Sequence, residues 1–452
     1  MVRGEGFFYL NRKGSAIKTT DAQKAERRCL RKEIFAWTLY DFANTSYSVI
    51  VVTVVYAIYY KQYIVGNYTI SLGHWVRNPG DFLWGLGGSL SMSLVALSAP
   101  IMGAAADYSN RKKMFMLIYT MVCIAAMASL YFLRPGMILQ GLLLFIFGNL
   151  GFEGALVFYN GFLPQISRPD NIGKISGYGF AIGYVGSLIS LLIALPYASK
   201  AFALNNLAVM RPTFIWAALF FFVFSLPFFF IVRERAIQMP DKTKNFFKEG
   251  YRRTLKTLKR IREFPEITKF LTAYFIYIDG VNTVIYFSGI YASSTLHFTV
   301  QQVIEFFAIV QSSAISGSYI FGYLTDKFGP KKTIMITLGL WIVVAVGAFF
   351  SYNMATFYIV GLIAGIAMGS SQSASRALMG RLIPEGMEAE FYGFYALMGK
   401  FSSILGPLVF GLVSTISGNQ RLAISSLLIF FIAGLFLISR VDEKITYKKM
   451  VL

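Results

Sequence analysis

The sequence is poor in charged residues and in the side chains that build metal or redox sites. Only 14% of its 452 residues are Asp, Glu, Lys or Arg, whereas a soluble domain carries roughly 25%. Two cysteines, Cys29 and Cys123, and two histidines, His74 and His297, stand far apart in the chain. Their spacing matches no disulfide, zinc or haem pattern, and neither a nucleotide-binding motif nor a nucleophile–base set is legible. We therefore expect no metal, no cofactor and no enzymatic activity.

Apolar residues, in contrast, are abundant: 56% of the chain is hydrophobic and 17% is aromatic. A bilayer core of ~30 Å needs ~20 apolar residues per helical crossing. Twelve runs meet this need, at 34–60, 83–106, 113–133, 137–163, 175–198, 212–232, 269–293, 301–325, 332–351, 353–380, 390–416 and 421–440. Runs 301–325 and 390–416 are the weakest because they carry many Ser and Gly, which are nevertheless common at helix contacts in membranes. The chain is predicted to be an all-α membrane protein without a cleavable signal peptide.

The net charge of +20 comes from basic residues that gather between the apolar runs. When the N-terminus is assigned to the cytoplasm and the runs alternate, 34 of the 42 Lys and Arg residues fall on cytoplasmic segments. This bias follows the positive-inside rule. It predicts twelve spans with both termini cytoplasmic, and it favours a bacterial inner membrane over an organelle. Nucleic acid is not an expected partner.

A long basic segment, 233–268, separates the sixth and seventh runs. Its apolar residues recur at helical spacing beside Lys and Arg, which predicts an amphipathic helix on the membrane or under the bundle. Residues 1–26 are polar and are expected to form a mobile tail. The predicted organisation is a cytoplasmic tail 1–33, a six-helix bundle 34–232, a cytoplasmic linker 233–268, a second six-helix bundle 269–440 and a tail 441–452.

Three sequence features recur in the same order in the two halves. The pattern Asp-x-x-Asn-Thr begins at Asp41 in the first run and at Asp279 in the seventh, and Leu163-Pro164 is matched by Ile383-Pro384. A Gly-x-x-x-Asp segment followed by basic residues ends the second and eighth runs, with Gly103, Asp107 and Arg111 in one half and Gly322, Asp326 and Lys331 in the other. A duplication of six helices places a substrate site between the halves, near the middle of the bilayer.

These paired Gly–Asp segments resemble the loop signature of the major facilitator superfamily, whose Asp is placed to cap helix ends and pair with cations, locking one face of the bundle. More narrowly, three motifs resemble the Atg22-like vacuole effluxer family: Trp37-Thr-Leu-Tyr40-Asp41-Phe42-Ala43-Asn44, Phe158-Tyr159-Asn160 and Gln372-x-x-Ser375-Arg376. The resemblance implies two six-helix pseudo-repeats, with spans one, four, seven and ten lining a cavity. It also implies transport, and its eukaryotic member is associated with the export of amino acids from the vacuole.

Ionisable residues are costly at membrane depth and usually face a cavity or a partner. Asp41, Glu153, Asp279 and Arg376 fall on the four spans named above, at similar depth, whereas Lys400 falls on the eleventh span. We expect Arg376 to pair with Glu153 or an Asp, and a solute or a proton to compete for that pair. The candidate substrate and coupling residues are Asp41, Asn44, Glu153, Tyr159, Asn160, Asp279, Asn282, Gln372 and Arg376. The alternative that these charges only hold helices together stays open, and Lys400 is assigned to that structural role.

The function that this pattern favours is secondary active transport of a small polar solute, such as an amino acid, by alternating access. The expected partners are that solute, protons as the coupling ion and the lipid bilayer, and the expected state is a monomer. The resemblance to the effluxer family implies export as the direction of transport. The alternative from another class is a membrane receptor or scaffold that has kept the fold without transport.

Overall fold

The computed structural model describes residues 19–66, 79–235, 245–402 and 405–444, and every regular element within them is helical. The α-helices of the first half are α1 (Thr19–Tyr47), α2 (Val55–Ile58), α3 (Pro79–Ser109), α4 (Lys112–Ser129), α5 (Ile138–Gly161), α6 (Leu163–Ile166), α7 (Ile172–Ala203) and α8 (Arg211–Ile231). After α9 (Phe246–Lys259) follow α10 (Pro265–Thr295), α11 (Val300–Phe328), α12 (Pro330–Phe349), α13 (Met354–Leu382), α14 (Glu388–Phe401), α15 (Leu405–Ser417), α16 (Gln420–Ser426) and α17 (Leu428–Ser439).

Helix starts in the second half follow local sequence signals. Pro265 and Pro330 stand in the first turns of α10 and α12, where a missing N–H costs no helical hydrogen bond. The Asn353 side chain accepts a hydrogen bond from Thr356 N and caps α13. Reciprocal bonds between Thr299 and Gln302 form a capping box at the start of α11. These signals place the membrane helices independently of their apolar content.

The first membrane helix is longer and less regular than expected. It begins at Thr19, so the described part of the predicted mobile tail is helical, while residues 1–18 and the segment 67–78 with His74 lie outside the described residues. Beyond Tyr47 the helix continues through two π-helical segments, Ser48–Thr53 and Tyr59–Val65, on either side of α2. Such segments widen the helix locally and often occur near functional sites.

Eleven helical stretches in the described parts of the chain are long and apolar enough to cross a membrane. The remaining long helix, α11, has 29 residues and corresponds to run 301–325, one of the two weakest span predictions. Its polar residues can face neighbouring helices instead of lipid, because α11 packs between α7 and α13. The predicted all-α membrane fold is confirmed, and α11 completes the set of twelve long helical stretches.

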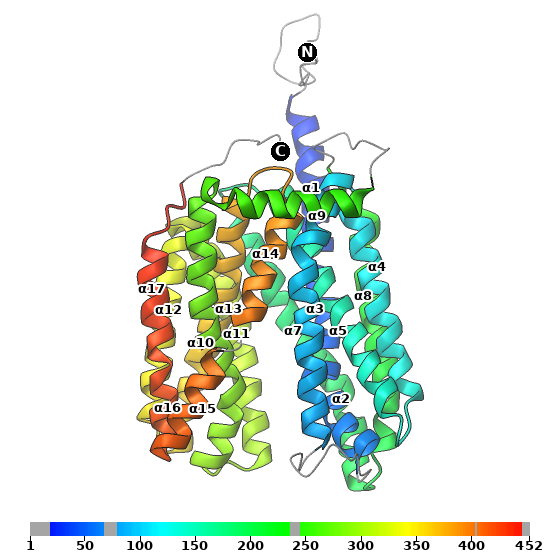
Figure 1. The fold of residues 1–452 in the computed structure, drawn as a ribbon, viewed down its shortest axis with the longest axis vertical. Helices are drawn as coiled ribbons and strands as arrows, with labels where there is room; N and C mark the ends of the chain where they lie inside the picture. Colours follow the sequence, from blue (N-terminus) through cyan, green and yellow to red (C-terminus); the bar gives the residue numbers. More distant parts are fainter. Residues whose placement is uncertain (1–18, 67–78, 236–244, 403–404, 445–452) are drawn as a thin grey trace, which may run out of the picture.

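Each half of the chain builds its own hydrophobic core. One core uses residues between Ala36 and Val232, joined by Ala377 and Ala389, and the other uses residues between Phe264 and Val441. The two helical bundles stand side by side, and α9 lies across one end of them (Figure 1). We call this end, which carries the start of α1, α9 and the end of α17, the termini face.

Contact between the bundles is concentrated on three helix pairs. α3 packs against α14, and α7 packs against α11 and α13. Among the described residues, the hydrogen bonds and ion pairs that join the bundles lie in the half of each membrane helix nearer the termini face. The bundles are therefore fastened together at the termini face.

Candidate functional site

The central polar contact between the bundles is an ion pair between α13 and α1. Arg376 Nη1 lies 3.1 Å from Asp41 Oδ2, and the two residues are only 3% and 7% exposed. The same guanidinium donates through Nε to Ser176 Oγ at 2.9 Å and through Nη2 to the Ser176 carbonyl at 2.7 Å. Because Asp41 and Ser176 both belong to the first bundle, this arginine of the second bundle binds across the interface with three hydrogen bonds.

Aromatic rings enclose the Arg376 guanidinium. Its central carbon lies 4.0 Å from the Phe180 ring centroid and 4.9 Å from that of Trp37. Trp37 is stacked on Tyr159 at 4.4 Å, and its indole N–H donates to the Tyr159 carbonyl at 3.0 Å. Cation–π contacts of this kind strengthen when the cation is shielded from water. The Trp37-x-x-x-Asp41 spacing thus puts a ring and a carboxylate on the same side of α1, both facing Arg376.

A second ion pair joins the bundles through Glu153 of α5 and Lys400 of α14. Lys400 Nζ lies 2.5 Å from Glu153 Oε1, and the two side chains are 25% and 12% exposed. This pair is thus more accessible than the pair of Arg376 and Asp41. Lys400 was assigned only a structural role from the sequence, yet the structure places it on a predicted site carboxylate.

The other candidate site residues divide between two places. Asn44 donates to Asp41 Oδ1 at 3.3 Å, Asn160 Oδ1 lies 3.5 Å from Arg376 Nη1, and Gln372 accepts from Tyr184 at 2.9 Å. Asp279 and Asn282 lie apart on α10. The Asp279 carboxylate accepts the backbone N–H of Gly406 at 2.8 Å, which ties α10 to α15 within the second bundle.

Arg376 thus pairs with Asp41, one of the partners expected for it, whereas Asp279, placed at similar depth by the sequence, does not join them. The charges form two separate pairs across the interface, whereas no ion pair within the described residues includes Asp279. Equal depth in the membrane could not distinguish these arrangements, because depth says nothing about the direction in which a side chain leaves its helix.

Asp107 of α3 fastens the first bundle to α14. Its two carboxylate oxygens accept the backbone N–H groups of Ala389 and Glu390, at 3.2 and 2.9 Å, in the first turn of α14. Lys112 Nζ bridges Asp107 at 2.9 Å and Glu388 at 2.6 Å, and all three side chains are buried. A Cβ atom added to Gly103 would lie 2.2 Å from the Ala389 carbonyl oxygen, so only glycine permits this approach. We call this set the α3–α14 gate.

Asp326 of α11 makes the matching contact with α7. Its two carboxylate oxygens accept the N–H groups of Gly173 and Lys174 at 2.7 and 2.9 Å. Helices α11 and α7 approach closely here, since a Cβ atom on Gly177 would lie 2.4 Å from the Ser318 carbonyl oxygen. We call this set the α7–α11 gate. In both gates a carboxylate from one bundle caps the N-terminus of a helix in the other, where the helix dipole favours negative charge.

The match to a family model identifies the group of proteins to which this chain belongs. Residues 85–174 and 170–449 match the model described as "Vacuole effluxer Atg22 like". The chain belongs to the Atg22-like vacuole effluxer family. It is thus a multi-pass membrane transporter of the major facilitator superfamily.

Relatives of this Atg22-like protein occur in bacteria and fungi. It is 30% identical to the uncharacterized MFS-type transporter YxiO of Bacillus subtilis over 91% of this chain and 95% of that protein. It is 23% identical to autophagy-related protein 22 of Coccidioides immitis over 74% of this chain and 68% of that protein.

Solved transporters share the fold of this Atg22-like protein. The proton:xylose symporter XylE matches with a TM-score of 0.71 at 14% identity, over 92% of this chain and 96% of that one. A bacterial homologue of ferroportin in an outward-facing state matches with a TM-score of 0.66 at 12% identity, over 91% and 98% of the two chains.

Sequence reasoning chose the wrong gate cations in this Atg22-like protein. Lys112, rather than the exposed Arg111, pairs with Asp107. Lys331 is turned into its own bundle, where its backbone N–H donates to Glu443 at 2.9 Å and its Nζ donates to the Ser439 carbonyl at 2.8 Å. The register of the basic residues in a loop follows from helix starts that the loop sequence alone does not fix.

Further residues of the gates could have been found from the repeat. Glu234, just after α8, accepts the N–H of Lys112 at 2.5 Å, as Glu443, just after α17, accepts that of Lys331. Glu33 accepts the N–H of Arg233, and Glu266 accepts that of Asp442. The matching signals are Val232-Arg-Glu234 and Val441-Asp-Glu443, which occupy the same place in the two halves.

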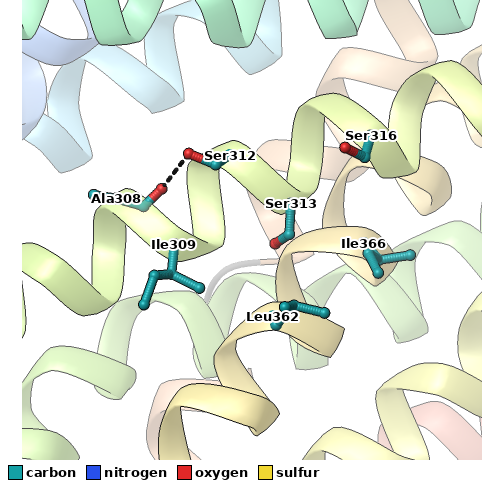
Figure 2. A pocket seen from close by; sticks show the side chains of 7 residues that line it. All are labelled: Ala308, Ile309, Ser312, Ser313, Ser316, Leu362 and Ile366. Carbon is teal, nitrogen blue, oxygen red and sulfur yellow. Dashed lines mark hydrogen bonds between the residues drawn. The ribbon is translucent and has the colours of Figure 1, made fainter.

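A cavity of about 480 Å³ lies between α11 and α13 of this Atg22-like protein (Figure 2). It is lined by Ala308, Ile309, Ser312, Ser313, Ser316, Leu362 and Ile366. The Ser312 hydroxyl donates to the Ala308 carbonyl of its own helix at 2.8 Å, so it is already partnered. The lining contains neither a charged residue nor a candidate site residue, so the cavity is distinct from the two ion pairs.

Proposed function

We propose that this chain is a secondary active transporter that moves a small zwitterionic solute, such as an amino acid, by alternating access. The proposal is supported above all by the Arg376–Asp41 pair, a buried charge pair shared between the two bundles. A buried pair is costly to maintain, and breaking it from one side leaves an uncompensated charge. A buried ion pair adds little stability to a protein that only has to hold two bundles together. In a transporter, the same pair is a contact that the solute can displace.

Access in this conformation is inferred from where the bundles touch. Both gates and both ion pairs lie toward the termini face, so solute would enter from the opposite face. The basic residues cluster near the termini face, which supports a cytoplasmic location for it and for both termini. Under this orientation the present state is outward-facing, and the membrane is the cytoplasmic membrane of a bacterium.

The arrangement of charges supports a zwitterion as the solute. In both pairs the carboxylate belongs to the first bundle, as Asp41 or Glu153, and the cation belongs to the second, as Arg376 or Lys400. A solute carboxylate can replace Asp41 at Arg376, while the solute ammonium group binds Glu153, the carboxylate of the more accessible pair. Such a solute would bridge the bundles as the present pairs do.

Proton coupling follows from the same exchange. When a solute carboxylate occupies Arg376, Asp41 loses its cationic partner in a buried site. Loss of an opposite charge favours the neutral form of a carboxyl group, so Asp41 would bind a proton at a carboxylate oxygen. Restoring the pair with Arg376 would release that proton after the solute leaves. Proton and solute would then move in the same direction, so an inward proton gradient would drive uptake, whereas export, the direction that fits the name of the family, would follow the solute's own gradient.

Counterflow of labelled amino acids in proteoliposomes tests this proposal. We expect Arg376→Ala to lower exchange about a hundredfold, because it removes the solute's cation and leaves Asp41 buried without its partner. Asp41→Asn should uncouple exchange from the pH gradient while exchange itself persists, and Glu153→Gln should weaken solute binding. Asp170→Asn, which removes an exposed carboxylate outside the pairs, is the matched control.

Two outcomes would count against the proposal. If no amino acid exchanges under any gradient, the solute class is wrong. If Asp41→Asn responds to a pH gradient as the unaltered protein does, coupling through Asp41 is wrong. Asp279→Asn reports separately on whether the third predicted carboxylate, which is bound to α15, takes part in coupling.

A further inference from the structure

Helix α9 of the linker lies across the termini face and presents one buried side to the bundle (Figure 1). Gly250, Arg253, Thr254 and Thr257 make this side. A Cβ atom on Gly250 would lie 2.7 Å from Ala105 Cβ, so α9 rests directly on α3. The Thr254 hydroxyl donates to the Pro100 carbonyl at 3.2 Å. These contacts fix α9 to the first bundle.

The same side of α9 also reaches the second bundle. Arg253 Nη2 donates to the Gly386 carbonyl at 3.1 Å, and Arg253 Nε lies 3.5 Å from Glu390 Oε2. Glu390 is fully buried in α14, next to the residue whose approach requires Gly103. α9 therefore spans the two bundles at the α3–α14 gate, and its docked position belongs to the state in which that gate is closed.

The outward side of α9 carries an exposed apolar stripe. Phe247, Tyr251, Leu255 and Leu258 recur at helical spacing and are 47%, 53%, 40% and 47% exposed. Residues spaced in this way share one side of a helix. Their combined apolar surface has no covering element among the described residues.

A basic stripe runs beside the apolar one. Lys248, Arg252, Lys256 and Lys259 are all exposed and are spaced four, four and three residues apart. The acidic residue of α9, Glu249, lies on the other flank of the helix and is half-buried. The exposed surface of α9 is thus apolar along one line and wholly cationic along the next.

The docking site places α9 below the end of α3. It contacts α3 between Pro100 and Ala105, which are nine and four residues before the end of α3 at Ser109. At about 1.5 Å per residue, α9 crosses α3 roughly 6–14 Å below the end of that helix. A helix at this level, parallel to the membrane surface, lies where headgroups meet acyl chains.

We propose that α9 binds anionic phospholipid at the termini face, and that this binding favours the closed α3–α14 gate. The cationic stripe matches anionic headgroups, and the apolar stripe inserts beside the acyl chains. Each basic residue near an anionic leaflet contributes about fivefold to binding. Because Arg253 links α9 to α14, lipid that holds α9 in place also holds the gate.

Hydrogen exchange of the full-length protein in vesicles tests the lipid contact. Vesicles of phosphatidylcholine alone are compared with vesicles that also contain phosphatidylglycerol, and the probe is the exchange rate of backbone amides in α9. We expect the anionic lipid to slow this exchange several-fold and added salt to reverse the effect. K248Q/R252Q/K256Q/K259Q should abolish the difference between the two lipids. The measurement does not involve transport, so its result is independent of the proposed solute and coupling.

Two further variants make the inference specific. R168Q/K327Q/K332Q/R440Q removes four exposed charges from the same face but not from α9, and it should keep the lipid effect.

R253Q/E390Q removes the contact between α9 and α14. In this variant α9 should remain protected by anionic lipid, while the gate no longer responds to the lipid. Gate opening is read as maleimide labelling of a cysteine at Ala389, which is buried at the α3–α14 contact, in a background without Cys29 and Cys123. Equal protection of α9 in both lipids, or loss of the effect in the first of these variants, would overturn the lipid site. A gate that still responds in R253Q/E390Q would overturn the link.

Discussion

The two gates are built on the same plan but differ in what has been added to it. In each, an aspartate near the end of one helix caps the first turn of a helix in the other bundle. Each of the two loops also has a residue with positive φ two positions before a lysine. Asn110, with φ 51°, precedes Lys112, and Gly329, with φ 90°, precedes Lys331. The shared plan therefore includes backbone conformation as well as side chains, as expected from a duplication.

The α3–α14 gate contains an additional buried charge network. Lys112 bridges two carboxylates in its interior, and Arg253 of α9 reaches Glu390 from outside. At the α7–α11 gate the corresponding basic contact is peripheral, since Lys174 donates to the Tyr323 hydroxyl at 2.9 Å and lies over its ring. The duplicated cap fastens both sides, and the linker reinforces one of them. We infer that opening costs more at the α3–α14 gate.

The largest expected difference is between Lys112→Met and Lys174→Met. Removing Lys112 leaves Asp107 and Glu388 buried without their cation, which should cost about 3–5 kcal/mol. Removing Lys174 breaks a peripheral contact and should cost at most about 1 kcal/mol. Thermal unfolding of the detergent-purified protein measures both changes. K112M/E388Q, which removes one of the two stranded charges, should recover part of the loss, and equal effects of the two lysines would refute the asymmetry.

A smaller difference is expected between Gly103→Ala and Gly322→Ala. The added Cβ would lie 2.2 Å from the Ala389 carbonyl oxygen in the first variant, but 3.1 Å from the Gly173 carbonyl oxygen in the second. The first contact forces the backbones apart at a cost of typically 1–3 kcal/mol, while the second requires only a slight shift. We expect Gly103→Ala to open the termini face and Gly322→Ala to leave it nearly closed. The readout is the rate of maleimide labelling at Ser373→Cys, in a background without Cys29 and Cys123.

The outcome at the gates shows which features could be predicted from the sequence. Helix positions and the duplication follow from apolar length and repeated motifs, which are local properties, while the aspartate caps were expected from the resemblance to the major facilitator superfamily. Partner choice does not, because it depends on the rotation of each helix and on elements distant in sequence. Lys400 was set aside since its span is not a cavity-lining one, yet it meets Glu153 at 2.5 Å. Asp279 shared the motif of Asp41 but turns to α15 instead of α13.

The pairing of Glu388 and Glu390 with Lys112 and Arg253 was missed for the same reason. The two glutamates begin an apolar run and read as first-turn residues of a helix, where acidic residues are common. Their partners come from α4 and α9, more than a hundred residues earlier in the chain. Local sequence signals described one side of each contact without indicating the other.

The smallest expected difference is between Glu443→Gln and Glu234→Gln, the acidic residues that cap α12 and α4. Losing the charge at the start of α12 should cost about 0.3–1 kcal/mol, because a carboxylate there interacts favourably with the helix dipole.

For Glu234, burial raises the pKa of the carboxyl group despite the hydrogen bonds from Lys113 and Lys112. A carboxyl with a raised pKa favours the folded state in its protonated form, so its contribution is fully present below the ordinary glutamate pKa of about 4.3 and declines as pH rises through the raised value. Glutamine resembles the protonated form of glutamate. Glu234→Gln should therefore cost less stability than Glu443→Gln at neutral pH. It should also flatten the decline of stability as pH rises above about 4.3, the ordinary glutamate pKa. Melting temperatures of both variants across acidic and neutral pH measure this, and a steeper decline in Glu234→Gln would show that the carboxylate is stabilised rather than penalised by its site.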